Sequence, residues 1–132
     1  MGQPAAKQGD QVVAVDMHIV MVPAPTGEVP TSLPHPFVGV LNGGLSANVN
    51  IMGKAAAVVG STADNKQTHI PTPPGTRFQR PPANKATIQL GSQTVNINGK
   101  PAARMGDKAL TCNDPADIPA GTVIAVSTVM IG

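Results

Sequence analysis

Hydrophobic residues in this chain fall in short runs, and most of these runs alternate between apolar and polar positions. The longest stretch free of Gly and Pro, Asp10 to Val22, is rich in valine and isoleucine, which fit a pleated strand better than a helix. Shorter alternating runs, each bounded by Gly, Asn or Pro, occur at residues 49–51, 87–90, 94–97 and 123–126. The pattern predicts an all-β domain of many short strands with essentially no helix.

Two proline-rich segments interrupt this alternation, one from Pro23 to Pro36 and the other from Ile70 to Pro82. Proline has no amide hydrogen to give to a strand ladder, and it fixes the direction of the chain. We therefore expect both segments to be ordered, extended loops rather than strands. A sharp turn is expected at Asn98-Gly99, directly after a strand-like run.

A nine-residue motif recurs along the chain. Residues 99–107, GKPAARMGD, match residues 2–10, GQPAAKQGD, and more loosely residues 53–61, GKAAAVVGS. A strand precedes the second and third copies, and the C-terminal run at residues 128–132 supplies the strand that the first copy lacks. We predict three similar units around a pseudo-three-fold axis, closed by the C-terminal strand, with the two termini adjacent. The alternative is that the motif is a common turn followed by small residues.

Paired alanines occur in every copy of the motif and suit positions where three segments approach closely around an axis. They are Ala5, Ala6, Ala56, Ala57, Ala102 and Ala103. The glycines that flank each copy permit sharp turns.

The composition narrows the possible functions. The 132 residues include 14 Gly, 14 Pro, two Phe and neither Trp nor Tyr, so stacking platforms for bases or sugars are not expected. A net charge of +2 with scattered Lys and Arg gives no support for nucleic-acid binding. No run is long enough to span a membrane, and no signal peptide opens the sequence. We therefore expect synthesis in the cytoplasm without a classical export signal.

The repeat also aligns the residues that can bind metals. His18 and His69 each lie 16 residues after the first glycine of their copies, and Cys112 lies 13 residues after that of the third copy. His35 lies in the first proline-rich segment. If the three repeat units converge on one axis, these four side chains lie close together. Three imidazoles with one thiolate match a closed, structural zinc site. Iron remains an alternative metal.

Other roles for these residues are common in proteins. A lone histidine in a loop is most often solvated, and a lone buried cysteine is usually a small core residue. Asp10, Asp107 and Arg104, next to glycine turns, are expected to be capping or pairing groups rather than catalytic residues.

The sequence Pro101-Ala102-Ala103-Arg104, with its PAAK counterpart at residues 4–7, resembles the motif of the PAAR-repeat proteins. These proteins form the sharp tip of contractile injection machines such as type VI secretion systems and phage-tail-like particles. The resemblance implies a small conical, β-prism-like domain whose base docks on a trimeric, VgrG-like spike protein. It also implies a zinc ion near the apex, bound by His18, His35, His69 and Cys112.

The resemblance covers residues 1–132, which we expect to form a single domain with no appended effector domain, and it implies a structural protein rather than an enzyme. We expect one chain per spike trimer and no homo-oligomer of the chain by itself. Effectors would be carried non-covalently, and contact with the target membrane would be transient. The protein would be delivered outside the producing cell or into the target cell. Two features depart from the family pattern. Ala55 replaces the proline of the motif, and the proline-rich segments are longer than a minimal member needs, as in the extended versions of phage-like particles.

Two other functions remain open from the sequence alone. One is a small cysteine/histidine hydrolase that uses Cys112 with His69 or His18, and it predicts an exposed thiol with a low pKa. The other is a free-standing module that binds a metal, a small ligand or a glycan, and the lack of Trp and Tyr argues against it.

Overall fold

A computed structural model describes residues 2–132, so that only the first residue of the predicted domain lies outside it. The described residues form strands and no helix, which confirms the predicted all-β class. They accordingly include no helix that could cross a membrane. The strands are β1 (Gln3–Pro4), β2 (Gln11–Ala24), β3 (Gly27–Gly43), β4 (Asn50–Ile51), β5 (Lys54–Ala55), β6 (Thr62–Asn65), β7 (Arg77–Phe78), β8 (Lys85–Ile88), β9 (Asn96–Ile97), β10 (Lys100–Pro101), β11 (Lys108–Thr111), β12 (Ile118–Ile124) and β13 (Met130–Ile131).

The largest sheet has the strand order β12-β11-β8-β6-β3-β2-β7, and β12 also pairs with β2. Six strands therefore close on themselves, while the two-residue β7 pairs with the outer part of β2. Closure leaves few unpaired edges in this part of the molecule. Its interior is filled by side chains that are at most 1 % exposed, including Val12, Phe37, Leu41, Ile88 and Val123.

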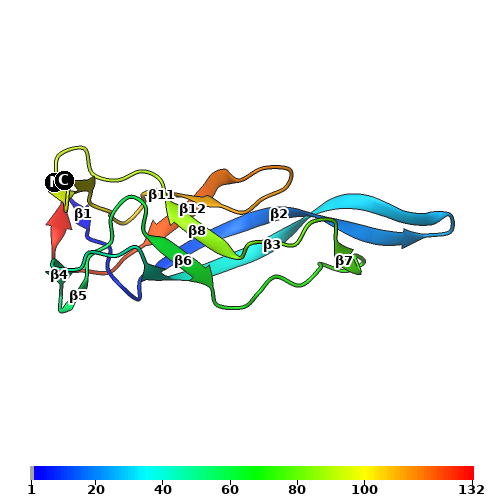
Figure 1. The fold of residues 1–132 in the computed structure, drawn as a ribbon, viewed down its shortest axis with the longest axis horizontal. Coiled ribbons are helices and arrows are strands. Elements are labelled where there is room, and N and C mark those ends of the chain that lie inside the picture. Colours follow the sequence, from blue (N-terminus) through cyan, green and yellow to red (C-terminus); the bar gives the residue numbers. More distant parts are fainter. Residues whose placement is uncertain (1) are drawn as a thin grey trace.

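Three two-stranded sheets form the end of the molecule where both termini lie (Figure 1). The hairpin of β4 and β5 pairs Ile51 with Lys54, and that of β9 and β10 pairs Ile97 with Lys100. The third sheet is not a hairpin, because it joins the two ends of the chain: β13 pairs with β1 and brings Ile131 opposite Gln3. The C-terminal strand thus completes the first copy of the motif, as predicted.

The predicted turn at Asn98-Gly99 connects β9 to β10. Both residues have positive φ angles, 54° and 79°, as a two-residue hairpin loop with the favourable twist requires. Met52 and Gly53 adopt the same conformation between β4 and β5, with φ angles of 51° and 80°.

A ring of backbone hydrogen bonds joins the three copies of the motif. The N–H of Ala57 donates to the carbonyl of Ala6, that of Ala103 to Ala57, and that of Ala6 to Ala103, each over 3.0 Å. All three alanines are completely buried. A larger side chain at any of these positions would meet the other two segments, which explains the repeated alanine.

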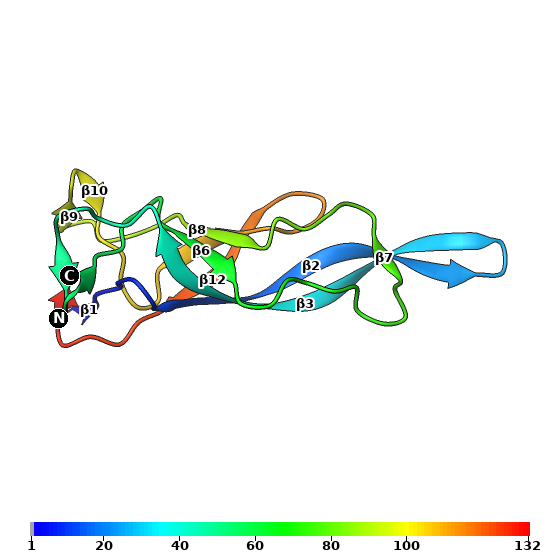
Figure 2. The same ribbon diagram turned by 60° about the horizontal axis from the view of Figure 1, so that its bottom comes forward.

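β2 and β3 form a long arm that extends away from the closed sheet (Figures 1 and 2). The two strands pair without interruption from Gln11–Val40 to Ala24–Gly27. The expectation of a loop from Pro23 to Pro36 is therefore wrong, because most of this segment belongs to β3. The Ile70–Pro82 segment is irregular, as predicted, except for β7.

The positions of the prolines explain how β3 tolerates them. Every second residue of β3 directs its backbone N–H and carbonyl away from β2. Val38 is one of them, because its N–H donates to Asn65 and its carbonyl accepts from the N–H of Lys66. The same alternation includes Pro30, Pro34 and Pro36. At these positions the missing N–H faces the outer edge of the arm, so that no hydrogen bond of the β2–β3 ladder is lost.

Ala57→Leu is expected to destabilise the fold by about 1–3 kcal/mol, because three backbone segments would have to separate around the added carbons. Urea unfolding of the purified chain measures this change. Ala47→Leu, at an exposed position, is the control and is expected to change stability by less than about 0.5 kcal/mol. Equal stability of both variants would contradict the importance of the alanine ring.

Candidate metal centre

Three histidine rings meet where the arm leaves the closed sheet. His18 comes from β2, His35 from β3, and His69 from the segment that follows β6. The ring centroids are 5.1 Å apart for His18 and His69, 5.4 Å for His18 and His35, and 5.5 Å for His35 and His69. The structure thus brings together the three imidazoles that the sequence analysis singled out.

Both phenylalanines of the chain pack on this cluster. Phe78 of β7 lies 5.7 Å from the ring of His18 and 5.3 Å from that of His35, while Phe37 lies 6.2 Å from His69. Because the sequence contains no Trp or Tyr, these two phenylalanines and three histidines are all the aromatic rings that it has. The two phenylalanines therefore shield the histidines from water, and Phe37 also belongs to the core of the closed sheet.

Asp16 joins the cluster, although the sequence analysis did not identify it. Its Oδ2 lies 2.9 Å from Nε2 of His69 and 4.0 Å from Nε2 of His18. One donor atom from each of Asp16, His18 and His69 lies within 4.8 Å of the other two. The available signal was the alternation of β2, since Asp16 and His18 lie on the same buried face as Val12 and Val20.

Several polar atoms at this site have no hydrogen-bond partner. They are Oδ1 of Asp16 and both ring nitrogens of His18, and the two side chains are completely buried. Unpaired polar atoms are costly in a protein interior, so each such group needs an explanation. A bound cation would pair with the carboxylate and with a lone pair of the imidazole, and these residues therefore fit a metal ion.

His18 and His35 have the protonation state that metal binding requires. Burial, and secondarily the proximity of His69, lowers the pKa of His18 below its usual value. Burial also lowers the pKa of His35. Both imidazoles are therefore neutral at physiological pH and keep a lone pair, and neutral imidazole is a common ligand of zinc.

The loop after β11 reaches the same region and holds β2 in place. Asn113 Oδ1 accepts a hydrogen bond from the N–H of Met17 at 2.6 Å, and Asp114 Oδ2 accepts one from the N–H of Ile19 at 2.9 Å. The same Oδ2 lies 3.5 Å from Nδ1 of His18. This loop therefore fixes the backbone on both sides of His18.

The charge of Asp114 is stabilised at this position. Burial alone would raise the pKa of Asp114, but the hydrogen bonds from Ile19 and Arg80 hold it below its usual value. Arg80 Nη2 donates to Asp114 Oδ1 at 2.7 Å. An ionised carboxylate thus faces Nδ1 of His18.

The other two predicted ligands have different surroundings. Nδ1 of His35 donates to the carbonyl of Leu33 at 2.9 Å, and Nε2 accepts from the N–H of Thr72 at 3.1 Å. The sulfur of Cys112 accepts a hydrogen bond from the N–H of Ala83 at 3.3 Å. Neither belongs to the group formed by the donor atoms of Asp16, His18 and His69.

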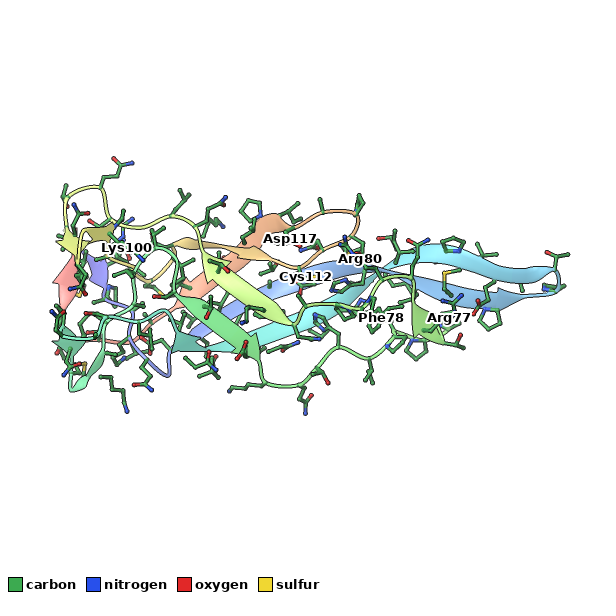
Figure 3. All side chains as sticks on the ribbon, in the orientation of Figure 1. Arg77, Phe78, Arg80, Lys100, Cys112 and Asp117 are labelled. Carbon is green, nitrogen blue, oxygen red and sulfur yellow. The ribbon has the colours of Figure 1, made fainter. Side chains whose placement is uncertain are left out.

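The pKa of the Cys112 thiol lies above its usual value, chiefly because the side chain is buried. Figure 3 shows Cys112 near Arg80 and Asp117, with Phe78 further along the arm. The thiol is therefore protonated at neutral pH when no metal is bound.

A groove leads from the surface to the histidine cluster. It is lined by His35 and His69 and by the irregular segment between them and β7, including Ile70 and Thr72. The groove provides a route by which an ion from solution would reach the donor atoms.

Comparison with protein-family models identifies the PAAR motif over residues 26–115. Comparison with curated proteins found no match. The match covers more than half of the chain and includes the second and third copies of the repeated motif. The chain therefore belongs to the PAAR-motif family, whose members form spike tips in contractile injection machines.

Proposed function

We propose that this protein caps a trimeric, VgrG-like spike protein of a contractile injection machine and sharpens the spike for piercing membranes. The observation that carries the proposal is the ring of hydrogen bonds among Ala6, Ala57 and Ala103. Because one residue from each copy of the motif contributes equally to this ring, it supports a pseudo-three-fold arrangement of a single chain. Such a base matches the symmetry of a trimer, with one chain per trimer.

The proposed docking surface is the hairpin end, which carries the two hairpins and the pair of terminal strands. Met52, Val129 and Met130 expose 56 %, 42 % and 57 % of their surface there. Lys100 lies at the same end (Figure 3). Exposed apolar side chains at one end of a monomer are typical of a protein–protein contact.

The proposed metal ion lies at the root of the arm and not at its apex, where the resemblance placed it, because β2 and β3 continue to pair beyond His18 as far as Ala24 and Gly27. His18 and His69 are the ligands that the geometry supports most directly, and His35 and Cys112, the other two predicted ligands, remain proposals. Zinc bound there would link β2 to the segment after β6, which are about fifty residues apart in sequence. Metal ligation contributes on the order of 10 kcal/mol to folding in small zinc domains, so it would stabilise the root of the arm against fraying.

The surroundings of Cys112 disfavour the hydrolase alternative. A nucleophilic cysteine needs a lowered pKa and a neighbouring base. Here the pKa of Cys112 is raised by burial, and the sulfur bonds to the N–H of Ala83. A mechanical role without catalysis agrees better with these contacts.

Delivery follows from the proposed position on the spike. The protein would leave the producing cell with the injection machine, contact the target membrane transiently through the arm and carry any effector non-covalently.

Metal content tests the proposed centre. Purified protein is expected to contain one zinc ion per chain, and its removal by a chelator is expected to lower the melting temperature by about 10 °C or more. His18→Ala and His69→Ala are expected to lose the ion, whereas Gln67→Ala, an exposed position near His69, retains it. A wild-type protein that is free of metal and equally stable in chelator would refute the zinc proposal.

Docking is tested by mixing the protein with candidate trimeric spike proteins and measuring the mass of the complex by light scattering. One chain per trimer is expected. Met52→Asp combined with Met130→Asp is expected to weaken binding about tenfold or more, because charges would enter an apolar contact. Val29→Asp, at an exposed position near the far end of the arm, should leave binding unchanged. Equal loss in both variants would argue against docking through the hairpin end.

A further inference from the structure

We propose that Pro30 and Pro34 keep this protein monomeric, because they prevent the arms of two molecules from pairing through the outer edge of β3. The partner that they exclude is a second copy of the chain, joined arm to arm. This role is independent of docking on a spike, for which the proposed surface is the hairpin end.

The arm is a structure that needs such protection. Its outer part is a ribbon of two strands, and the two-residue β7 is the only further strand that pairs with it there. A long, regular edge with free backbone groups is a template for pairing with another chain. The faces of the ribbon add apolar surface, since Val15 and Val29 are 58 % and 50 % exposed. An unprotected arm would therefore bind a second arm.

The edge formed by β2 is covered by other parts of the chain. The N–H groups of Met17 and Ile19 donate to side chains of the loop after β11. Met21, the next outward-facing residue, pairs with β7. Pro23, which follows in the same alternation, has no N–H. Only the edge formed by β3 is therefore open to another strand.

That outer edge of β3 offers few hydrogen-bond donors. Beyond the part that pairs with β6, the residues that direct their backbone away from β2 include Glu28, Pro30, Ser32 and Pro34, and all four are exposed. A neighbouring antiparallel strand forms hydrogen bonds at every second residue. Because proline has no N–H, Pro30 interrupts the series between the two donors that remain. This edge therefore cannot support a regular ladder.

The other common means of protecting an edge are weak on this strand. β3 contains no lysine or arginine, although charged side chains, lysine above all, often keep an edge strand from pairing. Its one acidic residue, Glu28, forms an ion pair with Arg77, in which Oε1 lies 2.6 Å from Nη2. The charge of Glu28 is thus largely neutralised, and the prolines are the main barrier to pairing.

Sedimentation velocity of the full chain over a range of concentrations tests this role. The wild type is expected to remain monomeric, whereas Pro30→Thr, which restores three successive donors, is expected to form a dimer. Adding Pro34→Thr is expected to tighten the dimer about tenfold, because the restored N–H occurs in both copies. Pro23→Thr restores one isolated donor on the opposite edge and is the matched control, which should remain monomeric.

A further substitution distinguishes edge pairing from aggregation of a misfolded chain. Neither proline contributes an N–H to the β2–β3 ladder, so the variants are expected to fold. Ser32→Lys combined with Pro30→Thr is expected to restore the monomer, because it places a charge on the pairing edge. In the Pro30→Thr dimer, hydrogen exchange at backbone positions 28, 30 and 32 is expected to slow about tenfold or more.

Three results would overturn the proposal. One is a wild-type protein that is itself dimeric. Another is a Pro30→Thr protein that stays monomeric at every concentration. The third is association that persists when Ser32→Lys is added, since material of that kind would not depend on the edge of β3.

Discussion

The close approach of three backbone segments at Ala6, Ala57 and Ala103 is the constraint on which the rest of the structure depends. Each segment gives one hydrogen bond to the next and accepts one from the previous, so the ring has no free end. The geometry requires a side chain no larger than a methyl group, and all three alanines are fully buried. With the segments fixed in this way, the strands that follow the motifs, β2, β6 and β11, enter one closed sheet, in which they alternate with β3, β8 and β12.

The three units differ at the end away from this ring. The first continues into the long arm of β2 and β3, the second into the irregular segment that carries His69, and the third into the short loop after β11. One end of the molecule is therefore built from three similar two-stranded sheets, and the other from three unlike segments that meet at the histidines. A single chain in this way has a repeated base, which suits the proposed contact with a spike, and a unique arm at its other end.

The sequence predicted the features that depend on the repeat. The match between copies located the closing strand at β13 and indicated that His18 and His69 approach each other. The extent of β3 was not predictable from proline content, because the cost of a proline depends on whether its missing N–H faces the partner strand or the outer edge. Pro30, Pro34 and Pro36 face the outer edge, and only the pairing register reveals this.

Asp16 escaped the sequence analysis for a related reason. The repeat aligned histidines and cysteine, but Asp16 has no counterpart in the other copies. Its significance comes from the inward face of β2, where an acidic residue lies between buried apolar neighbours. A charged residue on an otherwise apolar strand face therefore carries information that a search for ligand-spacing motifs does not use.

The position of the candidate centre also has a mechanical consequence. A two-stranded ribbon is only marginally stable by itself, and beyond β7 the arm has no further strand to support it. A load on the tip of the arm would bend it most strongly where it joins the closed sheet. His18, His35, Phe78 and the loop at Asp114 all lie at that junction, on four different segments. An ion held there would therefore brace the arm at its root, where bending would otherwise separate the strands.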